Sequence, residues 1–149
     1  MRSGLLALII CLLVTRPAVA ASVEDVIAQA RTACEGLEDG AFHSAENAVV
    51  SIDLNRDSET ETIIDESRFS CSSSASLFAA TGGSMLHVIV GDEHYIWQAL
   101  GWRTITWGED TILLLAMHGT HCGGYGYQKC YEAVVFNGNV PTSVATPPQ

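Results

Sequence analysis

The hydrophobic positions of the chain follow two different periods. From Val23 to Cys34, apolar residues recur at helical spacing, and the glycines Gly36 and Gly40 end that run. Ser22 is a suitable N-cap because Asp25 stands three residues later, as in a capping box. The sequence therefore predicts one amphipathic helix that opens the domain and ends at these glycines.

After this helix, apolar residues alternate with a period of two, β-branched and aromatic residues become frequent, and clusters of Gly, Asp, Asn and Ser interrupt the pattern. The segments of this kind are expected to be strands, at 48–53, 60–65, 85–90, 94–100, 103–107, 111–117 and 131–137. Tight turns at 91–93, 100–102 and 108–110 favour antiparallel hairpins. The pattern predicts an α+β fold with an N-terminal helix packed on a mainly antiparallel, twisted β-sheet.

Both ends of the chain are expected to lie outside the folded domain. Residues 1–20 combine an early Arg2, an apolar run and a final Ala18-Val19-Ala20, which is the pattern of a cleaved secretory signal peptide. The residues after Asn137-Gly138 are rich in Pro, Ser and Thr, so 139–149 are expected to be a disordered tail. Residues 21–138 then form a single domain in the periplasm or the medium.

Length and charge narrow the function classes. The chain has 149 residues, 7 Lys and Arg, and 17 Asp and Glu, with a formal net charge of −10. A field of this sign repels phosphate backbones, so no nucleic-acid partner is expected. The apolar run within 1–20 is shorter than the about 20 residues that a membrane-spanning helix needs, and no other stretch approaches that length. No membrane span is expected.

Four cysteines follow the predicted signal peptide: Cys34, Cys71, Cys122 and Cys130. An even number of cysteines in a small exported domain predicts two disulfides. Four cysteines allow three pairings, but Cys122 and Cys130 are close in sequence and are joined by a glycine-rich loop that can bring its ends together. We expect these two to pair, which leaves Cys34 to pair with Cys71. Metal ligation by these thiols is the weaker alternative.

The segment from 49 to 65 is the richest in candidate ligands. Asp53, Asn55 and Asp57 place oxygen side chains at alternate positions, and Glu61 follows four residues later. Such oxygens can converge on a hard cation such as calcium, which takes six to eight oxygen ligands. The flanks are predicted strands, which favours a strand-loop-strand site. The alternative is a metal-free β-hairpin turn.

This segment resembles the calcium loop of the FG-GAP or integrin-type propeller repeat, in which a strand, an Asp-x-Asn-x-Asp loop with a further acid, and a second strand follow one another. Arg56 and Ser58 occupy positions that are usually glycine in that family, and Glu61 a position that is usually aspartate. The whole chain also resembles a set of small exported bacterial proteins of unassigned function. The resemblance to the propeller-repeat loop implies calcium bound by Asp53, Asn55, Asp57 and Glu61.

Two further groups of residues could carry a function. His118 and His121 lie close together, and with a nearby carboxylate they would suit a small hydrolase. Tyr125 and Tyr127 alternate with glycines inside the predicted disulfide loop, where both rings cannot easily be buried. Tyrosines presented on a clamped loop are typical of recognition surfaces, because they offer large contact area at low entropic cost.

No recognisable nucleophile motif is present, and the cysteines are expected to be bridged, so an enzyme is the less favoured class. The sequence predicts an exported, non-catalytic binding or structural module that recognises a protein or cell-envelope partner through Tyr125 and Tyr127 and that is stabilised by calcium. The alternatives are the hydrolase with His118 or His121 and a secreted enzyme inhibitor that plugs a cleft with its disulfide loop.

Overall fold

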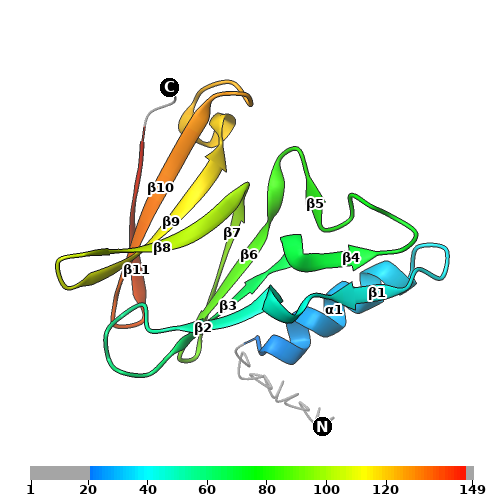
Figure 1. Ribbon diagram of the computed structural model, residues 1–149, viewed down its shortest axis with the longest axis horizontal. Helices are drawn as coiled ribbons and strands as arrows, with labels where there is room; N and C mark the ends of the chain where they lie inside the picture. The colour runs from blue at the N-terminus through cyan, green and yellow to red at the C-terminus, as the bar shows by residue number, and fades with distance from the viewer. Residues whose placement is uncertain (1–20, 147–149) are drawn as a thin grey trace, which may run out of the picture.

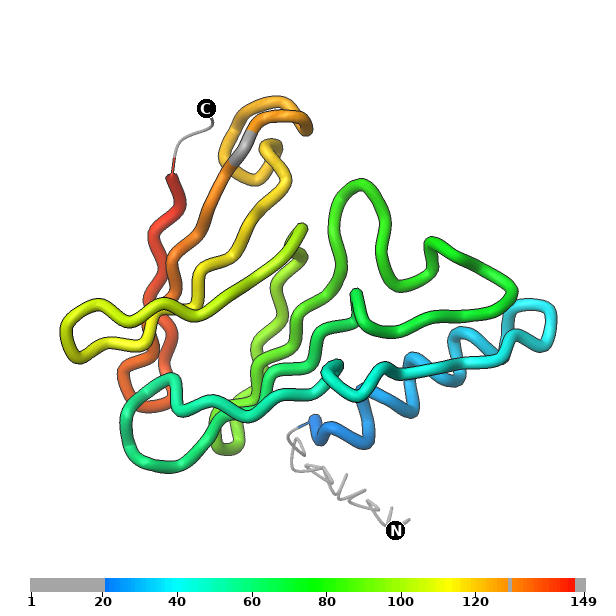
Figure 2. Tube along the Cα trace, viewed as in Figure 1, coloured from blue at the N-terminus to red at the C-terminus, as the bar shows by residue number. Residues whose placement is uncertain are grey.

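The computed structural model describes residues 21–146, and the ribbon and the trace show the course of the chain (Figures 1 and 2). The predicted class is confirmed, since one α-helix packs on antiparallel sheets within these residues. In chain order the elements are α1 (Val23–Glu35), β1 (Phe42–Ser44), η1 (Glu46–Ala48), β2 (Val49–Ile52), β3 (Glu61–Asp65), η2 (Glu66–Arg68), β4 (Phe69–Cys71), β5 (Ala79–Ala80), β6 (Gly83–Val90), β7 (Glu93–Ala99), β8 (Gly101–Trp107), β9 (Asp110–His118), η3 (Gly119–Cys122), β10 (Lys129–Asn137) and β11 (Val140–Ala145).

Helix α1 begins and ends where the sequence predicts. The Ser22 hydroxyl accepts a hydrogen bond from the backbone N–H of Asp25, and the Asp25 carboxylate accepts one from the Ser22 N–H, which completes the capping box. The C-cap residue is Gly36. Val26, Ala30 and Cys34 form the buried face of the helix.

The predicted strands divide between two sheets instead of forming one. The five-stranded sheet has the order β2-β3-β6, with β7 paired along β6 and the short β5 paired at the start of β6. The four-stranded sheet has the order β11-β10-β9-β8. Leu100 alone separates β7 from β8, and its backbone N–H donates to the Ala116 carbonyl at 2.7 Å. The prediction of a hairpin turn at 100–102 is therefore wrong: β7 and β8 do not pair, and the chain changes sheets within one residue.

The larger core lies between these two sheets. Leu86 and Val88 of β6 pack in one buried cluster with Leu113 and Leu115 of β9 and Val134 of β10, each at most 1% exposed. Alternation along each strand directs these side chains to the shared interior. The sheets therefore form a two-layer sandwich.

A second core lies on the opposite face of the five-stranded sheet, where α1 and the two-stranded β1–β4 sheet cover it (Figure 1). Ile64 of β3 contributes to this core, whereas its neighbour Ile63 faces the sandwich core. Phe42, Phe69 and Phe78 meet edge to face, with ring centroids 5.2 to 5.7 Å apart. β1, β4 and β5 lie outside the predicted strands because they are two or three residues long, too short to show a period.

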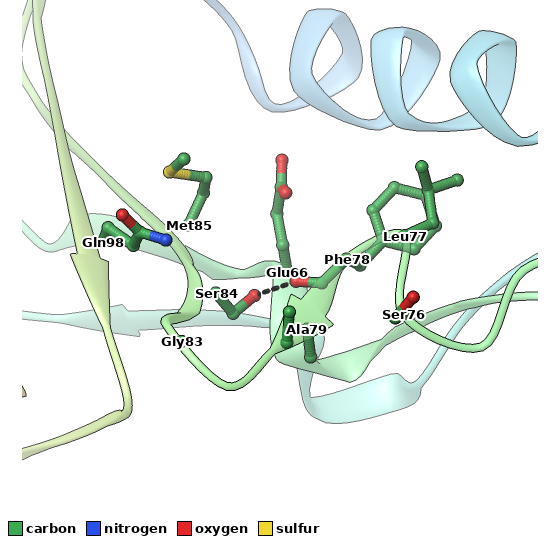
Figure 3. A pocket seen from close by; sticks show the side chains of 10 residues that line it. Glu66, Ser76, Leu77, Phe78, Ala79, Gly83, Ser84, Met85 and Gln98 are labelled. Carbon is green, nitrogen blue, oxygen red and sulfur yellow. Dashed lines mark hydrogen bonds between the residues drawn. The ribbon is translucent and has the colours of Figure 1, made fainter. Parts of the chain in front are cut away.

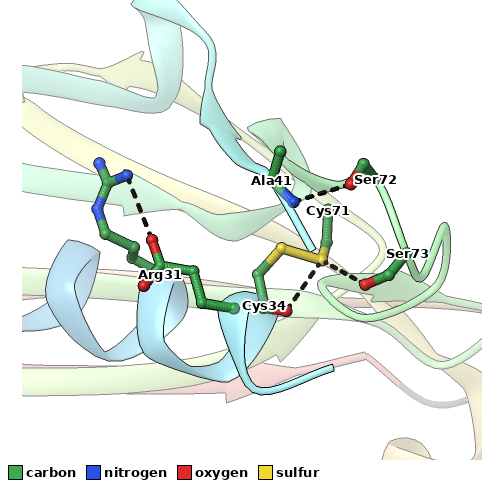
Figure 4. The surroundings of a disulfide bond; sticks show 7 residues. Arg31, Cys34, Ala41, Cys71, Ser72 and Ser73 are labelled. Carbon is green, nitrogen blue, oxygen red and sulfur yellow. Dashed lines mark hydrogen bonds and ion pairs between the residues drawn. A yellow bond between two sulfur atoms is a disulfide. The ribbon is translucent and has the colours of Figure 1, made fainter. Parts of the chain in front are cut away.

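Both disulfide pairings agree with the prediction. Cys34 at the end of α1 is bonded to Cys71 of β4, with Cα atoms 5.5 Å apart (Figure 4). The Ser72 hydroxyl beside this bond accepts a hydrogen bond from the Ala41 N–H at 2.8 Å. The bridge thus attaches the helix to the small sheet at the centre of the second core. Cys122 is bonded to Cys130.

The prediction of a disordered tail over 139–149 is wrong for Val140–Ala145, which form strand β11. The predicted turn at Asn137-Gly138 is present, with Gly138 at φ 57°, and it folds β11 back along β10 in six paired positions. β-Branched residues alternate along β11, and its backbone satisfies the edge of β10 that would otherwise be unpaired. The predicted signal peptide, 1–20, and residues 147–149 lie outside the described residues.

Candidate functional site

The loop that carries Tyr125 and Tyr127 joins β9 to β10 at one end of the four-stranded sheet. The short helix η3 opens the loop, and the Cys122–Cys130 disulfide closes it. Cys130 is 1% exposed and belongs to the sandwich core. One end of the loop is therefore attached directly to the most buried part of the molecule.

Backbone hydrogen bonds hold the loop internally. The Gly124 N–H donates to the Gly119 carbonyl at 2.9 Å, and the Gln128 N–H donates to the Tyr125 carbonyl at 2.9 Å. The Gln128 side-chain oxygen in turn accepts from the Tyr125 N–H at 2.7 Å. A Cβ atom added at Gly119 would lie 2.0 Å from the Tyr125 carbonyl oxygen, so only glycine fits there. The backbone position of Tyr125 is thus fixed by close contacts within the loop.

The two tyrosine rings point away from this framework. Tyr125 is 70% exposed and Tyr127 is 85% exposed. Their planes are parallel within 2°, and their centroids are 5.9 Å apart. The loop therefore presents a pair of aligned aromatic surfaces to solvent, which agrees with the expectation that both rings cannot be buried.

His118 and His121 do not form the arrangement that a hydrolase would need. The His118 Nδ1 lies 2.8 Å from the Thr120 hydroxyl, and the His118 ring packs closely against Gly126. His121 is exposed in η3. Within residues 21–146, neither imidazole has a hydrogen bond or an ion pair with a carboxylate. His118 instead forms part of the wall of the tyrosine loop.

The acidic loop between β2 and β3 is organised by its first aspartate. One Asp53 carboxylate oxygen accepts from the Arg56 N–H at 2.6 Å, and the other accepts from the Ser58 N–H at 3.2 Å. The Asn55 side-chain oxygen accepts from the Asp57 N–H at 3.1 Å, and the Asp57 carboxylate accepts from the Glu59 N–H at 2.8 Å. These bonds curl the loop around its own side-chain oxygens.

Arg56 and Ser58 have left-handed backbone conformations, with φ values of 68° and 72°. These are the two positions that are usually glycine in the family that this segment resembles. A non-glycine residue costs roughly 1 to 2 kcal/mol in this conformation. The loop therefore adopts its curled backbone despite two residues that disfavour it.

Three of the four predicted calcium ligands face a common space. Asn55, Asp57 and Glu61 line a cleft of about 330 Å³. Glu61 is 4% exposed, and its carboxylate accepts a hydrogen bond from the Leu54 N–H. Asp53 is absent from that lining, and both its oxygens are bonded to the loop backbone. A carboxylate or amide oxygen can accept more than one bond, so the oxygens of the other three residues remain chemically suited to a cation.

A different group of titratable side chains comes together on the five-stranded sheet. His87 of β6 is 8% exposed, and its Nε2 lies 3.0 Å from Oε1 of Glu66 in η2. Its Nδ1 lies 3.0 Å from Nε2 of His94 in β7. An ionised carboxylate only accepts, so His87 donates from Nε2. The geometry implies a carboxylate–imidazole–imidazole chain that ends at His94 Nδ1.

Burial and the nearby charge of His87, in that order, lower the pKa of His94 below its ordinary value of 6.5. The sequence pattern did not indicate this chain. Glu66 and His87 are 21 positions apart, so pairing of β3 with β6 is needed to bring them together. The only signal for this group in the local sequence is that polar residues occur in neighbouring strands that are otherwise apolar.

Glu66 also borders a small hollow of about 170 Å³ at the start of β6 (Figure 3). In this view Glu66 and Met85 extend to the same side of the ribbon, and Leu77 and Phe78 form an apolar wall. The Ser84 hydroxyl donates to the Phe78 carbonyl at 2.5 Å, so it is bound to the backbone and is not free as a nucleophile.

In the described part of the chain, no three His, Cys, Asp or Glu side chains are grouped closely enough to hold a metal ion. Across residues 21–146, no helix combines the length and the apolar character that crossing a bilayer requires. Comparisons with protein families, with curated proteins and with solved structures found no match for this chain.

Proposed function

We propose that this protein is an exported, non-catalytic binding module that recognises a protein or cell-envelope partner through Tyr125 and Tyr127. The observation that carries the proposal is the pair of parallel, 70% and 85% exposed rings on a loop that a disulfide and internal hydrogen bonds hold in place. A preorganised loop loses little conformational entropy on binding, and tyrosine brings large contact area with few rotatable bonds.

Export to the periplasm or the medium is part of this proposal. The pattern of residues 1–20 supports it, as do two disulfides, which persist in oxidising compartments. The formal net charge of −10 favours a neutral or basic partner surface over an acidic one. A secreted inhibitor is a special case in which the partner is an enzyme and the loop enters its cleft.

A site-specific crosslink tests the proposal in the exporting cell. The full chain would carry the photoreactive residue p-benzoylphenylalanine in place of Tyr127, and in a second strain in place of Leu37, a 41% exposed apolar residue that follows α1 on another part of the surface. We expect one discrete adduct from position 127, suppressed by excess wild-type protein but not by the Tyr125→Ala/Tyr127→Ala double variant. Equal adducts from both positions, or suppression by both competitors, would rule out recognition through the loop.

The hydrolase alternative has less support. The imidazole–carboxylate pair found in residues 21–146 is His87 with Glu66, not a pair that includes His118 or His121. His87 is nearly buried, and the serine closest to it in sequence is bonded to a backbone carbonyl. Hydrolysis of a model ester that is lost in a His118→Ala/His121→Ala variant of unchanged fold would restore this alternative.

We also propose that calcium stabilises the acidic loop, with Asn55, Asp57 and Glu61 as the residues that would hold the ion. Their shared cleft and the left-handed conformations of Arg56 and Ser58 support this role. In this role the ion orders the loop and takes no part in a reaction.

Thermal unfolding in excess EGTA and then in excess calcium, with magnesium as the control ion, tests the calcium proposal. At about 100 times its dissociation constant, calcium stabilises the native state by roughly 2.7 kcal/mol, a shift of several degrees. Asp57→Ala should abolish the calcium increment, and Asp92→Ala, at an exposed acid outside the loop, should keep it. Equal shifts with calcium and magnesium, or none, would contradict the proposal.

A further inference from the structure

The outer face of the four-stranded sheet is apolar across its strands. Leu113, Leu115 and Val134 point into the sandwich core, so residues one position away along each strand point outward. Strand pairing aligns these outward residues in rows across the sheet. The half-buried apolar side chains among them are Ile105, Ile112, Leu114, Ala116, Ala133 and Val135.

No helix or strand among residues 21–146 lies over this face: α1 and the β1–β4 sheet cover the five-stranded sheet instead (Figure 1). None of the six side chains belongs to either buried core. A sheet with one face in a core normally presents polar residues on the other. A contiguous exposed apolar face of this kind marks an interaction surface.

The charges on this face do not oppose contact with another copy of the chain. The three rows that begin at Gly101, Arg103 and Ile105 of β8 contain one charged side chain in residues of described side-chain placement, Arg103, and the fourth row pairs Trp107 with Asp110. The molecule as a whole carries a formal net charge of −10, so most of its surface would repel a second copy. These rows bring no acidic side chain against another.

A hollow and a projecting side chain lie on the same strand. At one end of β8, a hollow of about 340 Å³ is lined by Gly101, Trp102, Arg103, Leu114, Ala116 and Tyr131. At the other end, Trp107 is 74% exposed and follows the same outward alternation, as the last residue of β8 before the turn into β9. Small residues create the hollow, and the largest side-chain type is displayed six positions away.

We propose that two copies of the chain form a two-fold symmetric dimer through this face, with Trp107 of each copy in the hollow beside Gly101 of the other. The two-fold axis lies between the two facing sheets and runs perpendicular to β8, level with Thr104. Rotation about this axis reverses the direction of the strand. The Trp107 end of one copy then lies over the Gly101 end of the other. Arg103 borders the hollow, so its guanidinium can lie over the inserted indole as a cation–π pair.

The position of both features on one strand favours a second copy over an unrelated partner. An isologous interface must be self-complementary, with each contact made twice. The exposed Trp107 and the hollow beside Gly101, at opposite ends of β8, meet that condition directly. A different partner would need only one of these two features. Trp and Arg are also the residue types that dominate interface energies. Face-to-face sheets pack about 10 Å apart, a distance that Ile and Leu side chains from both copies fill.

The test is the mass of the exported protein in solution. The full chain is expressed with its N-terminal segment, recovered after export, and examined by sedimentation velocity over a wide range of concentrations. We expect twice the chain mass at high concentration. Trp107→Ala should weaken the dimer at least about tenfold, because it removes a hot-spot side chain. Gly101→Leu should weaken it as strongly, because it fills the hollow from within the same copy.

Both variants should fold normally, since Trp107 is exposed and a Cβ added at Gly101 would meet no atom within 4 Å. Circular dichroism and thermal unfolding check this. Tyr127→Ala, which removes an 85% exposed aromatic from a different surface, is the matched control and should leave the dimer intact. A monomer at every concentration, a dimer unaffected by both variants, or a dimer dissociated by Tyr127→Ala would overturn the proposal. The crosslinking test at position 127 is independent of this result.

Discussion

The His87 Nδ1 lies 3.0 Å from the His94 Nε2 across paired strands β6 and β7. The rings are within 17° of parallel and their centroids are 5.2 Å apart, so they meet through their nitrogens rather than through their faces. On the other side, His87 is bonded to Glu66. This arrangement couples the protonation of the two histidines, because a second proton must disrupt the hydrogen bond between them.

The native state should lose stability as the pH falls below about 6.5, the ordinary pKa of histidine. The folded-state pKa of His94 is lowered by burial and by the charge of His87. In the window between these two pKa values the unfolded chain binds a proton that the folded chain does not. The contribution of His94 to stability is therefore fully present above its unfolded-state pKa. It is lost as the pH falls through the folded-state pKa.

Urea unfolding at about pH 7.5 and about pH 5.5 measures this effect. The comparison of wild type with His94→Gln isolates His94 from the carboxylates, which also titrate toward the acid end. Glu66 and His87, the titratable groups of the same chain of contacts as His94, are present in both proteins. We expect the wild type to lose more stability than the variant between the two pH values. An identical loss in both proteins would contradict the prediction.

Glu66→Ala should destabilise the protein by about 1 to 3 kcal/mol, because it leaves the nearly buried His87 without the acceptor of its N–H. Glu66→Gln should cost less, because the amide oxygen can accept the same hydrogen bond. Chemical denaturation at neutral pH compares the two. If both variants lost the same stability, the Glu66 carboxylate would matter for its charge and not for this hydrogen bond.

Arg56→Gly and Ser58→Gly should each stabilise the protein by about 0.5 to 1 kcal/mol. Both residues have positive φ, and the relief of that strain exceeds the entropy that glycine adds to the unfolded chain. The ion pair of Arg56 with Glu109 is 3.9 Å long and Glu109 is almost fully exposed, so its loss has little effect.

Thr60→Gly is the matched control for these variants, because Thr60 lies in the same loop without a positive φ. It should destabilise the protein by roughly 0.5 to 1 kcal/mol. The midpoint of guanidinium unfolding reports all three variants. Destabilisation by Arg56→Gly and Ser58→Gly as large as that by Thr60→Gly would show that the left-handed conformations carry no strain.

The two disulfides should differ in their contribution to stability. Cys34 and Cys71 are 37 positions apart and Cys122 and Cys130 are 8 apart. The chain-entropy relation gives about 4 kcal/mol for the first and about 2.5 kcal/mol for the second. Paired Cys→Ala variants measured by urea unfolding test the order. A larger loss from the 122–130 pair would mean that the tyrosine loop contributes more to the core than its length implies.

The sequence by itself determined the local elements. The helix with its Ser22–Asp25 capping box, the main strands and the closely spaced Cys122–Cys130 pair all follow from short-range periodicity, turn residues and spacing, which act within a few residues. The alternation of Tyr with Gly at 125–127 likewise indicated exposed rings, because that segment has no apolar neighbours with which to bury them.

The tertiary structure decided how those elements share their faces. The apolar run Ile112–Met117 fits a strand buried on both sides or on one, and only the pairing of β9 within an outer sheet leaves Ile112 and Leu114 uncovered. The contact of Glu66 with His87 likewise depends on register between strands distant in sequence. These relationships come from long-range packing, in which the gain for one strand depends on which other strand lies beside it, and no local pattern encodes that choice.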